Sequence, residues 1–282
     1  VIAMRRAGSR IDDISSISSI RIKHILLATI KVAAMSLLEL FFLAVITDDT
    51  KVPFVERIAP ARFTLRMSAF GAIDLKPSEI RYEAIVSSAN KCIEGVPGFG
   101  FIIARKDELE AAKGNSHSLS LDVHAQWAHM NKTGQWRFTP PTHVVAAFLV
   151  ALRLHEAEGG VVGRGNRYFE NRDVVVSGMR ELGFETLLKD RWLSPIIVTF
   201  FCPSDENFIF EKFYELMKNK GFIIYPGKLT AVDSFRVGCI GQMDENVMLQ
   251  VVAAAKGTLE EMGVTSAAPP AIALEERAKL AA

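Results

Sequence analysis

The sequence is poor in cysteine and has almost no net charge. Its 282 residues include three cysteines, Cys92, Cys202 and Cys239, whose separations do not match a metal site. An odd cysteine count without a secretory signal is more typical of a reducing compartment than of a disulfide framework, so we expect a cytoplasmic protein. Lys plus Arg number 33 and Asp plus Glu 32, which gives a net charge of +1. Nothing in this balance indicates a nucleic-acid partner or a membrane-surface protein.

Long hydrophobic runs are also scarce. The strongest run is VAAMSLLELFFLAVI at residues 32–46, which is interrupted by Glu39 and preceded by Lys31. A helix that spans a membrane needs about 20 apolar residues, so this run favours a buried helix or strand. A membrane-tethered chain remains the weaker alternative. A signal peptide is disfavoured because the run begins late and no small-residue cleavage site clearly follows it.

The rest of the composition is that of a globular protein. Hydrophobic residues make up 49% and charged residues 23%, and the length is sufficient for two domains. Residues 1–66 show no clear helical or strand period, and we treat them as an atypical N-terminal segment. From Met67 onward, apolar runs bounded by glycine and small residues become regular.

The regular part of the chain predicts an α/β fold with two domains. Strands are expected at residues 82–89, 98–105, 194–203, 222–227 and 234–241, and helices at 106–113, 142–160, 167–184, 207–220 and 244–264. We therefore expect a large α/β domain at 67–160 and a smaller α+β domain at 161–264. Prolines open the segment 265–282, which we expect to be a flexible tail.

A single lysine, Lys91, lies in the stretch SSANKCIEGVPGFGF at residues 87–101. Most lysines are solvated, so a surface position is the default interpretation. Here, however, the lysine stands between two predicted buried strands and is surrounded by small residues. Burial lowers the pKa of an amine, and a neutral amine can form a Schiff base with an aldehyde cofactor. The small neighbours would leave room for a flat ring.

Several ordered motifs resemble one enzyme family. SSANKCIEGVPGFGF, SHSLSLD, AQW, WRFTPPTH, GFIIYPGKLT and SFRVGCIG are similar to the 2-aminoethylphosphonate:pyruvate aminotransferases, which depend on pyridoxal 5'-phosphate and have fold type I. The resemblance runs from about Met67 to Val264. It implies a homodimer that transfers the amino group of 2-aminoethylphosphonate to pyruvate. It also implies that Lys91 binds the cofactor covalently and moves the proton between substrate and cofactor.

The resemblance assigns roles to four further residues. Arg236 would hold the carboxylate or phosphonate of the substrates, since a guanidinium binds such anions with two parallel hydrogen bonds. A plain ion pair at a strand edge is the structural alternative for this arginine. Thr139 would reach the cofactor phosphate across a dimer interface. Ser88 and Asn90 would contact the cofactor beside Lys91.

No metal site is expected in the histidine-containing stretch. His117, His124 and His129 lack the spacing and the carboxylate partner of a metal site, so we interpret them as surface or substrate-loop residues.

Two features of the family are missing from the sequence. Counting back from Met67, Leu65 stands where the family has the aspartate that keeps the cofactor's pyridine nitrogen protonated, and Asp74 lies beyond the motif. No phosphate-binding segment is recognisable in residues 1–66. We interpret the abrupt start of the resemblance as replacement of the N-terminal part by unrelated sequence. The alternative function is therefore a catalytically impaired remnant that acts only as a folded or dimerising body.

Overall fold

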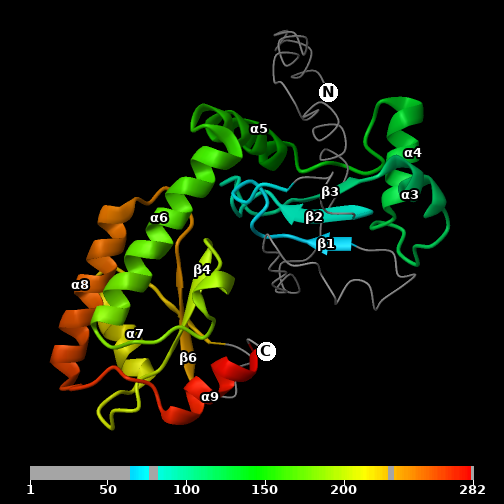
Figure 1. Cartoon of the computed structure of the whole chain (residues 1–282). Coiled ribbons are helices and arrows are strands. Elements are labelled where there is room, and N and C mark those ends of the chain that lie inside the picture. Colours follow the sequence, from blue (N-terminus) through cyan, green and yellow to red (C-terminus); the bar gives the residue numbers. More distant parts are fainter. Residues whose placement is uncertain (1–63, 76–81, 228–231, 281–282) are drawn as a thin grey trace.

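The computed structural model describes residues 64–75, 82–227 and 232–280. These residues form two three-stranded sheets, and two long helices in series lead from the first sheet to the second (Figure 1). The apolar run at 32–46 lies outside the described residues. Among the helices that are described, none has both the length and the apolar character needed to cross a membrane.

The first sheet contains β1 (Thr64–Arg66), β2 (Ala84–Ser88) and β3 (Gly100–Ala104). Strand β2 lies in the middle, parallel to β1 and antiparallel to β3. Both strands predicted for this region are thereby confirmed. Because β1 and β2 run in the same direction, their carboxyl ends meet at one edge of the sheet. The turn that contains Lys91 follows β2 at this edge.

Four helices follow the first sheet: α3 (Lys106–Ala111), α4 (Val123–Thr133), α5 (Thr142–Ala157) and α6 (Gly160–Glu181). Helix α4 was not predicted from the sequence, because its residues are largely polar. It begins with a side-chain cap, in which the backbone N–H of Ala125 donates to Asp122 Oδ1 over 2.8 Å. It ends at Gly134, which has a φ of 68°.

Helix α6 starts seven residues before the predicted position and contains glycines that other residues could not replace. A Cβ on Gly163 would lie 1.9 Å from the backbone oxygen of Glu158, and a Cβ on Gly165 would lie 2.5 Å from that of Ala72. Glycine disfavours a helix interior, which is why the sequence pattern did not predict this start. Close packing against the preceding turn and the loop after β1 requires glycine here.

This packing predicts that Gly165→Ala destabilises the protein, although alanine is the better helix former. The added methyl group would press on a backbone oxygen, and we expect a loss of about 1–3 kcal/mol in the free energy of unfolding. Gly257→Ala in another helix is the matched control, because its Cβ would lie 3.7 Å from Lys220 Cε, an ordinary contact. The free energy of unfolding of that variant should rise by about 0.5–1 kcal/mol. Urea denaturation measures the change in both variants. Equal effects of the two substitutions would contradict the packing argument.

The second sheet contains β4 (Ile197–Phe201), β5 (Tyr225–Pro226) and β6 (Ser234–Gly238), with β6 in the middle and antiparallel to both neighbours. A short 3-10 helix at Asp190–Trp192 precedes β4. Helices α6, α7 (Phe210–Asn219) and α8 (Glu245–Met262) lie on one side of this sheet (Figure 1). The predicted strands and helices of this region are confirmed.

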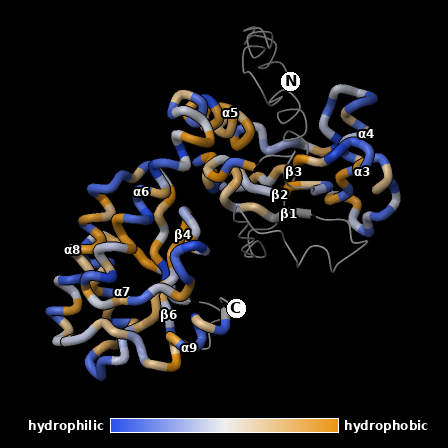
Figure 2. Tube along the Cα trace, in the orientation of Figure 1, coloured by the Kyte–Doolittle hydropathy of each residue, from blue (hydrophilic) through white to orange (hydrophobic). Residues whose placement is uncertain are grey.

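Phenylalanines form the centre of the second core. Phe184, Phe200, Phe213 and Phe235 are all fully buried, and their ring centroids lie 5.4–6.4 Å apart in the contacting pairs. In Figure 2, by contrast, much of α5 is coloured as strongly hydrophobic, although only Phe148 and Ala151 of this helix are buried.

The segment from residue 265 differs from the flexible tail that its composition predicted. It contains α9 (Ala271–Leu280), and Ala267 and Ala273 are buried against the rest of the protein. Arg277 Nη1 donates to Glu185 Oε2 over 2.6 Å. Small side chains, this ion pair and hydrogen bonds from Thr265 and Ser266 to Asp205 Oδ2 attach the segment, and none of them produces a strong hydrophobic pattern in the sequence.

Candidate active site

The turn after β2 presents Lys91 on a firmly anchored backbone. The N–H of Glu94 donates to the Lys91 oxygen over 2.8 Å, and the N–H of Gly95 donates to the Ala89 oxygen over 2.7 Å. Ala89 and Cys92, on either side of the lysine, are completely buried, whereas Lys91 is only half-buried. The lysine is thus less enclosed than its apolar surroundings in the sequence suggested. Its backbone is anchored in the core while part of its side chain is accessible.

The loop that follows β1 packs beneath this turn. Met67 N–H donates to the Val86 oxygen over 2.9 Å, and Ser87 Oγ donates to the Met67 oxygen over 2.8 Å. Cys92 Sγ lies 3.4 Å from the Ser68 oxygen. Burial raises the pKa of the Cys92 thiol to about 12, which makes it an unreactive core residue. The MSAFG and NKCIEG motifs therefore form one structural unit.

Three of the predicted site residues are neighbours in the chain, at the end of β2 and in the turn that follows it. Ser88 is the last residue of β2 and pairs with Gly100 of β3, while Asn90 directly precedes Lys91 in the turn. Ser88 and Asn90 are both partly exposed, as Lys91 is.

The other two predicted residues lie on separate segments. Thr139 is exposed in the loop that precedes α5. Arg137 in the same loop donates through Nη1 to the Leu119 oxygen over 2.9 Å, which ties this loop to the segment before α4. Arg236 lies on β6 of the second sheet, where its Nε donates to the Pro226 oxygen over 3.1 Å. Its guanidinium is partly exposed.

Leu65 occupies the strand next to the one that leads to Lys91. It pairs with Ile85 in the parallel register of β1 and β2. The residue at this position therefore lies on the strand beside the one that leads to the lysine turn, opposite the second residue of β2, and leucine contributes no charge there. Asp74 is exposed beyond the MSAFG loop.

The three histidines of this stretch lie on or just before one helix. His124 and His129 lie on α4, and His117 precedes that helix. Within residues 64–75, 82–227 and 232–280, no group of three His, Cys, Asp or Glu side chains is placed to hold a metal ion.

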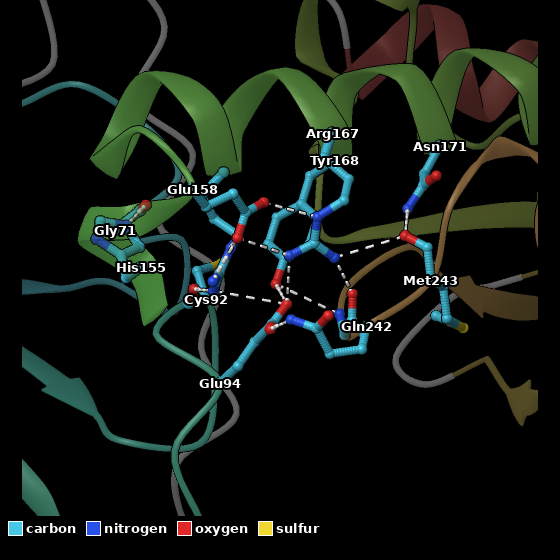
Figure 3. Close-up of polar contacts among 12 residues, drawn as sticks. Gly71, Cys92, Glu94, His155, Glu158, Arg167, Tyr168, Asn171, Gln242 and Met243 are labelled. Atoms are coloured by element: carbon cyan, nitrogen blue, oxygen red, sulfur yellow. Dashed lines mark hydrogen bonds and ion pairs between the residues drawn. The ribbon is translucent and has the colours of Figure 1, made fainter. Parts of the chain in front are cut away.

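A buried polar network connects the lysine turn to α6 and to the segment after β6 (Figure 3). Helix α6 contributes Arg164, Arg167, Tyr168 and Asn171, whose spacing of three, four and seven residues places them on one face. The sequence pattern did not predict this network. In the sequence, polar residues stand at the helical spacing at which a core-facing helix normally has apolar residues, and this departure could have indicated the network.

Two carboxylates in this network bind the arginines. Glu158 Oε2 lies 2.6 Å from Arg164, Glu158 Oε1 lies 2.7 Å from Arg167 Nε, and Glu94 Oε1 lies 3.0 Å from Arg167 Nη2. The Arg164 side chain is 1% exposed, and its Nη1 also donates to the Cys92 oxygen over 2.5 Å. Such buried charges are stable only when every partner is in place.

The network predicts a loss of stability in acid. Burial alone would raise the pKa of Glu158, but hydrogen bonds from Arg167 and Arg164 outweigh it and lower that pKa from 4.5 to about 2. Since the pKa is lower in the folded state, the stabilisation is complete above pH 4.5 and disappears as the pH falls towards 2. The pKa of Glu94 is lowered as well, against the effect of burial, by hydrogen bonds from Tyr168 and Gln242. The urea midpoint should therefore fall with pH in this window.

Glu158→Gln is the control for this pH dependence. It removes one titrating carboxylate of the network, so its urea midpoint should fall less steeply between pH 4.5 and 2. A slope equal to that of the parent chain would show that the Glu158 pairing does not control acid stability.

Comparison with known proteins shows which enzymes the chain is similar to. No family model matches the chain. It is 76% identical over 216 residues to a 2-aminoethylphosphonate–pyruvate transaminase of Rhizobium meliloti (strain 1021), a match that covers 77% of this chain and 56% of the relative. It is 70% identical over 215 residues to a transaminase of the same name from Paraburkholderia xenovorans (strain LB400), covering 76% and 55%. The chain is related to the 2-aminoethylphosphonate–pyruvate transaminases. The resemblance seen in the sequence motifs is confirmed.

The chain spans little more than half the length of these transaminases. Solved structures show the same fold. Ureidoglycine–glyoxylate aminotransferase from Bacillus subtilis has a TM-score of 0.61 at 18% identity, covering 78% of this chain and 58% of that one. Pyridoxamine–pyruvate aminotransferase from Mesorhizobium loti has a TM-score of 0.60 at 19% identity, covering 75% and 54%. The fold is therefore that of the pyridoxal-phosphate-dependent aminotransferases of fold type I, as predicted.

Proposed function

We propose that the protein is a pyridoxal-phosphate-dependent aminotransferase that moves the amino group of 2-aminoethylphosphonate to pyruvate. The products would be phosphonoacetaldehyde and L-alanine. The observation that supports this most strongly is the 76% identity to a transaminase of that name over 216 residues, a region that brings with it an anchored, accessible lysine. We further propose a cytoplasmic homodimer with domains at 67–160 and 161–264.

The residues around Lys91 fit the attachment end of the cofactor. Its side chain is half-buried at the end of β2, and the neighbouring Ser88 and Asn90 add small polar groups. Pyridoxal phosphate, when bound, supplies the ring that accepts electrons from the broken C–H bond. Lys91 Nζ would hold the cofactor and then carry the proton, and Thr139 of a second copy would bind its phosphate.

Arg236 is proposed as the anion-binding residue for both substrates. It is partly exposed on β6, and its Nε is oriented by the Pro226 oxygen at 3.1 Å. A planar guanidinium binds carboxylate or phosphonate oxygens through paired N–H donors. Because both substrates are anions, one arginine can orient each in turn.

Leu65 supports the second candidate function, an impaired remnant that acts as a folded or dimerising body. The position beside Ile85 lies on the strand next to the lysine strand, yet leucine cannot hold a charge against a ring nitrogen. Catalysis would be slow without that charge, while attachment of the cofactor to Lys91 would not require it.

The visible absorbance of the purified chain with added pyridoxal phosphate tests the proposal. We expect an absorbance band of lysine-bound cofactor that is absent from Lys91→Ala and is lost when 2-aminoethylphosphonate is added. A band that forms but does not respond to the amino donor would support the impaired remnant. If neither protein develops a band, the proposed cofactor binding is wrong.

A further inference from the structure

We propose that Glu94 is the positioning residue that holds the Lys91 turn, and with it Lys91 Nζ, against α6 and the segment that follows β6. This inference rests on the proposed function only in treating Lys91 as the cofactor lysine. Glu94 lies three residues after Lys91, and its N–H donates to the Lys91 oxygen over 2.8 Å.

The carboxylate of Glu94 collects donors from two separate parts of the chain (Figure 3). Tyr168 Oη and Arg167 Nη2, both from α6, donate to Oε1, the latter over 3.0 Å. Gln242 Nε2 donates to Oε2 over 2.6 Å. One side chain in the lysine turn is thus bound simultaneously to the helix and to the segment after β6.

The same helix also binds the backbone of that segment. Asn171 Nδ2 donates to the Cys239 oxygen over 3.1 Å and to the Met243 oxygen over 3.0 Å. Arg167 donates to the Gly241 oxygen. These residues directly follow β6, which carries Arg236. Helix α6 therefore holds both the lysine turn and strand β6 in place.

The backbone of Glu94 indicates that its side chain is needed at this place. Its φ is 59°, and it is the one described residue other than glycine with a positive φ. Glycine adopts this conformation without cost, whereas other residues do not. The carboxylate, only 13% exposed, therefore compensates for a backbone conformation that would by itself favour glycine.

A purely stabilising ion pair is the alternative, and Glu158 provides the matched control. Glu158 binds the same Arg164 and Arg167 but belongs to the end of α5 and not to the lysine turn. Glu94→Gln and Glu158→Gln each remove one carboxylate from the same arginines. Only the first removes a side chain of the turn itself, whereas Glu158 acts on the turn only through Arg164 and Arg167, so the first should loosen the turn much more.

Amide hydrogen exchange measures the turn directly. In Glu94→Gln the amides of Glu94 and Gly95 should exchange about tenfold faster than in the parent chain, as expected for loss of a charge-assisted hydrogen bond. In Glu158→Gln they should stay within about twofold of the parent rates. Glu94→Gly, which relieves the backbone but lacks the carboxylate, should also lose protection.

Two results would overturn the proposal. One is an equal increase in the exchange rates of these amides in Glu94→Gln and Glu158→Gln, which would show that the network only stabilises the fold in general. The other is full protection of these amides against exchange in Glu94→Gly, which would show that backbone geometry alone holds the turn. If Glu94→Gln does not fold, Tyr168→Phe removes one hydrogen bond to Glu94 while keeping every charge, and the same acceleration is expected there.

Cofactor trapping separates this proposal from the proposed function. Pyridoxal phosphate is added to each variant, reduced with borohydride, and the modification of Lys91 is quantified by mass spectrometry. We expect slower modification in Glu94→Gln than in Glu158→Gln at equal folded fraction. Absence of modification in the parent chain would refute the cofactor role of Lys91, while hydrogen exchange would still decide the role of Glu94.

Discussion

Phe235→Ala is expected to lower the free energy of unfolding by about 3–5 kcal/mol. Phe235 is fully buried on the central strand of the second sheet, with ring centroids of Phe184, Phe200 and Phe213 at 5.5, 5.7 and 5.4 Å. Removing the ring leaves a cavity that these rigid neighbours cannot fill. Urea denaturation of the parent and variant chains measures the loss.

Phe169→Ala is the control for this prediction. Phe169 is 37% exposed and contacts Arg172 over its ring face. Its truncation should cost within about 1 kcal/mol, because an exposed cation–π contact contributes little. Similar losses at positions 169 and 235 would mean that the phenylalanine cluster is not the main core of this sheet.

Leu65→Asp is expected to raise the rate of the proposed transamination by about 10²–10³-fold, the typical contribution of one electrostatic group at a reacting centre. The register of β1 with β2 places residue 65 beside Ile85, on the strand adjacent to the one that leads to Lys91. By the family resemblance, a carboxylate at this position would supply the charge held against the cofactor ring nitrogen. Single-turnover spectra with 2-aminoethylphosphonate measure the rate.

Leu65→Asn separates charge from shape in this experiment. Asparagine has nearly the same size as aspartate but no charge, so it should leave the rate near that of the parent chain. Both polar residues disfavour a strand, and their urea midpoints should fall together. Equal rates for the two variants would show that position 65 does not face the cofactor ring.

Local sequence patterns predicted most of the elements between residues 82 and 262. The strands β2, β3, β4 and β6 were recognisable as short apolar runs with small or glycine flanks, because such runs bury both faces of a strand. Helix α8 was recognisable from its apolar face and its cap at Asp244, whose Oδ1 accepts from the Val247 N–H. These signals are local, so they can be recognised without knowledge of the tertiary structure.

The predictions that differed from the structure concern elements held by contacts distant in sequence. The glycine-rich start of α6 is stabilised by packing against Ala72, and α9 is held by Arg277 on Glu185. In both cases the local composition indicates a break or a tail. Tertiary contacts outweigh that preference.

By itself the sequence determined the α/β order of elements, and its motifs pointed to the aminotransferases and to Lys91. Only the tertiary structure decided how the lysine turn is held. Glu94 meets Tyr168 and Gln242 across 74 and 148 residues of chain, and no local period records such a contact. The physical reason is that a buried carboxylate must find its donors wherever the fold brings them, and the fold brings them from α6 and the segment after β6.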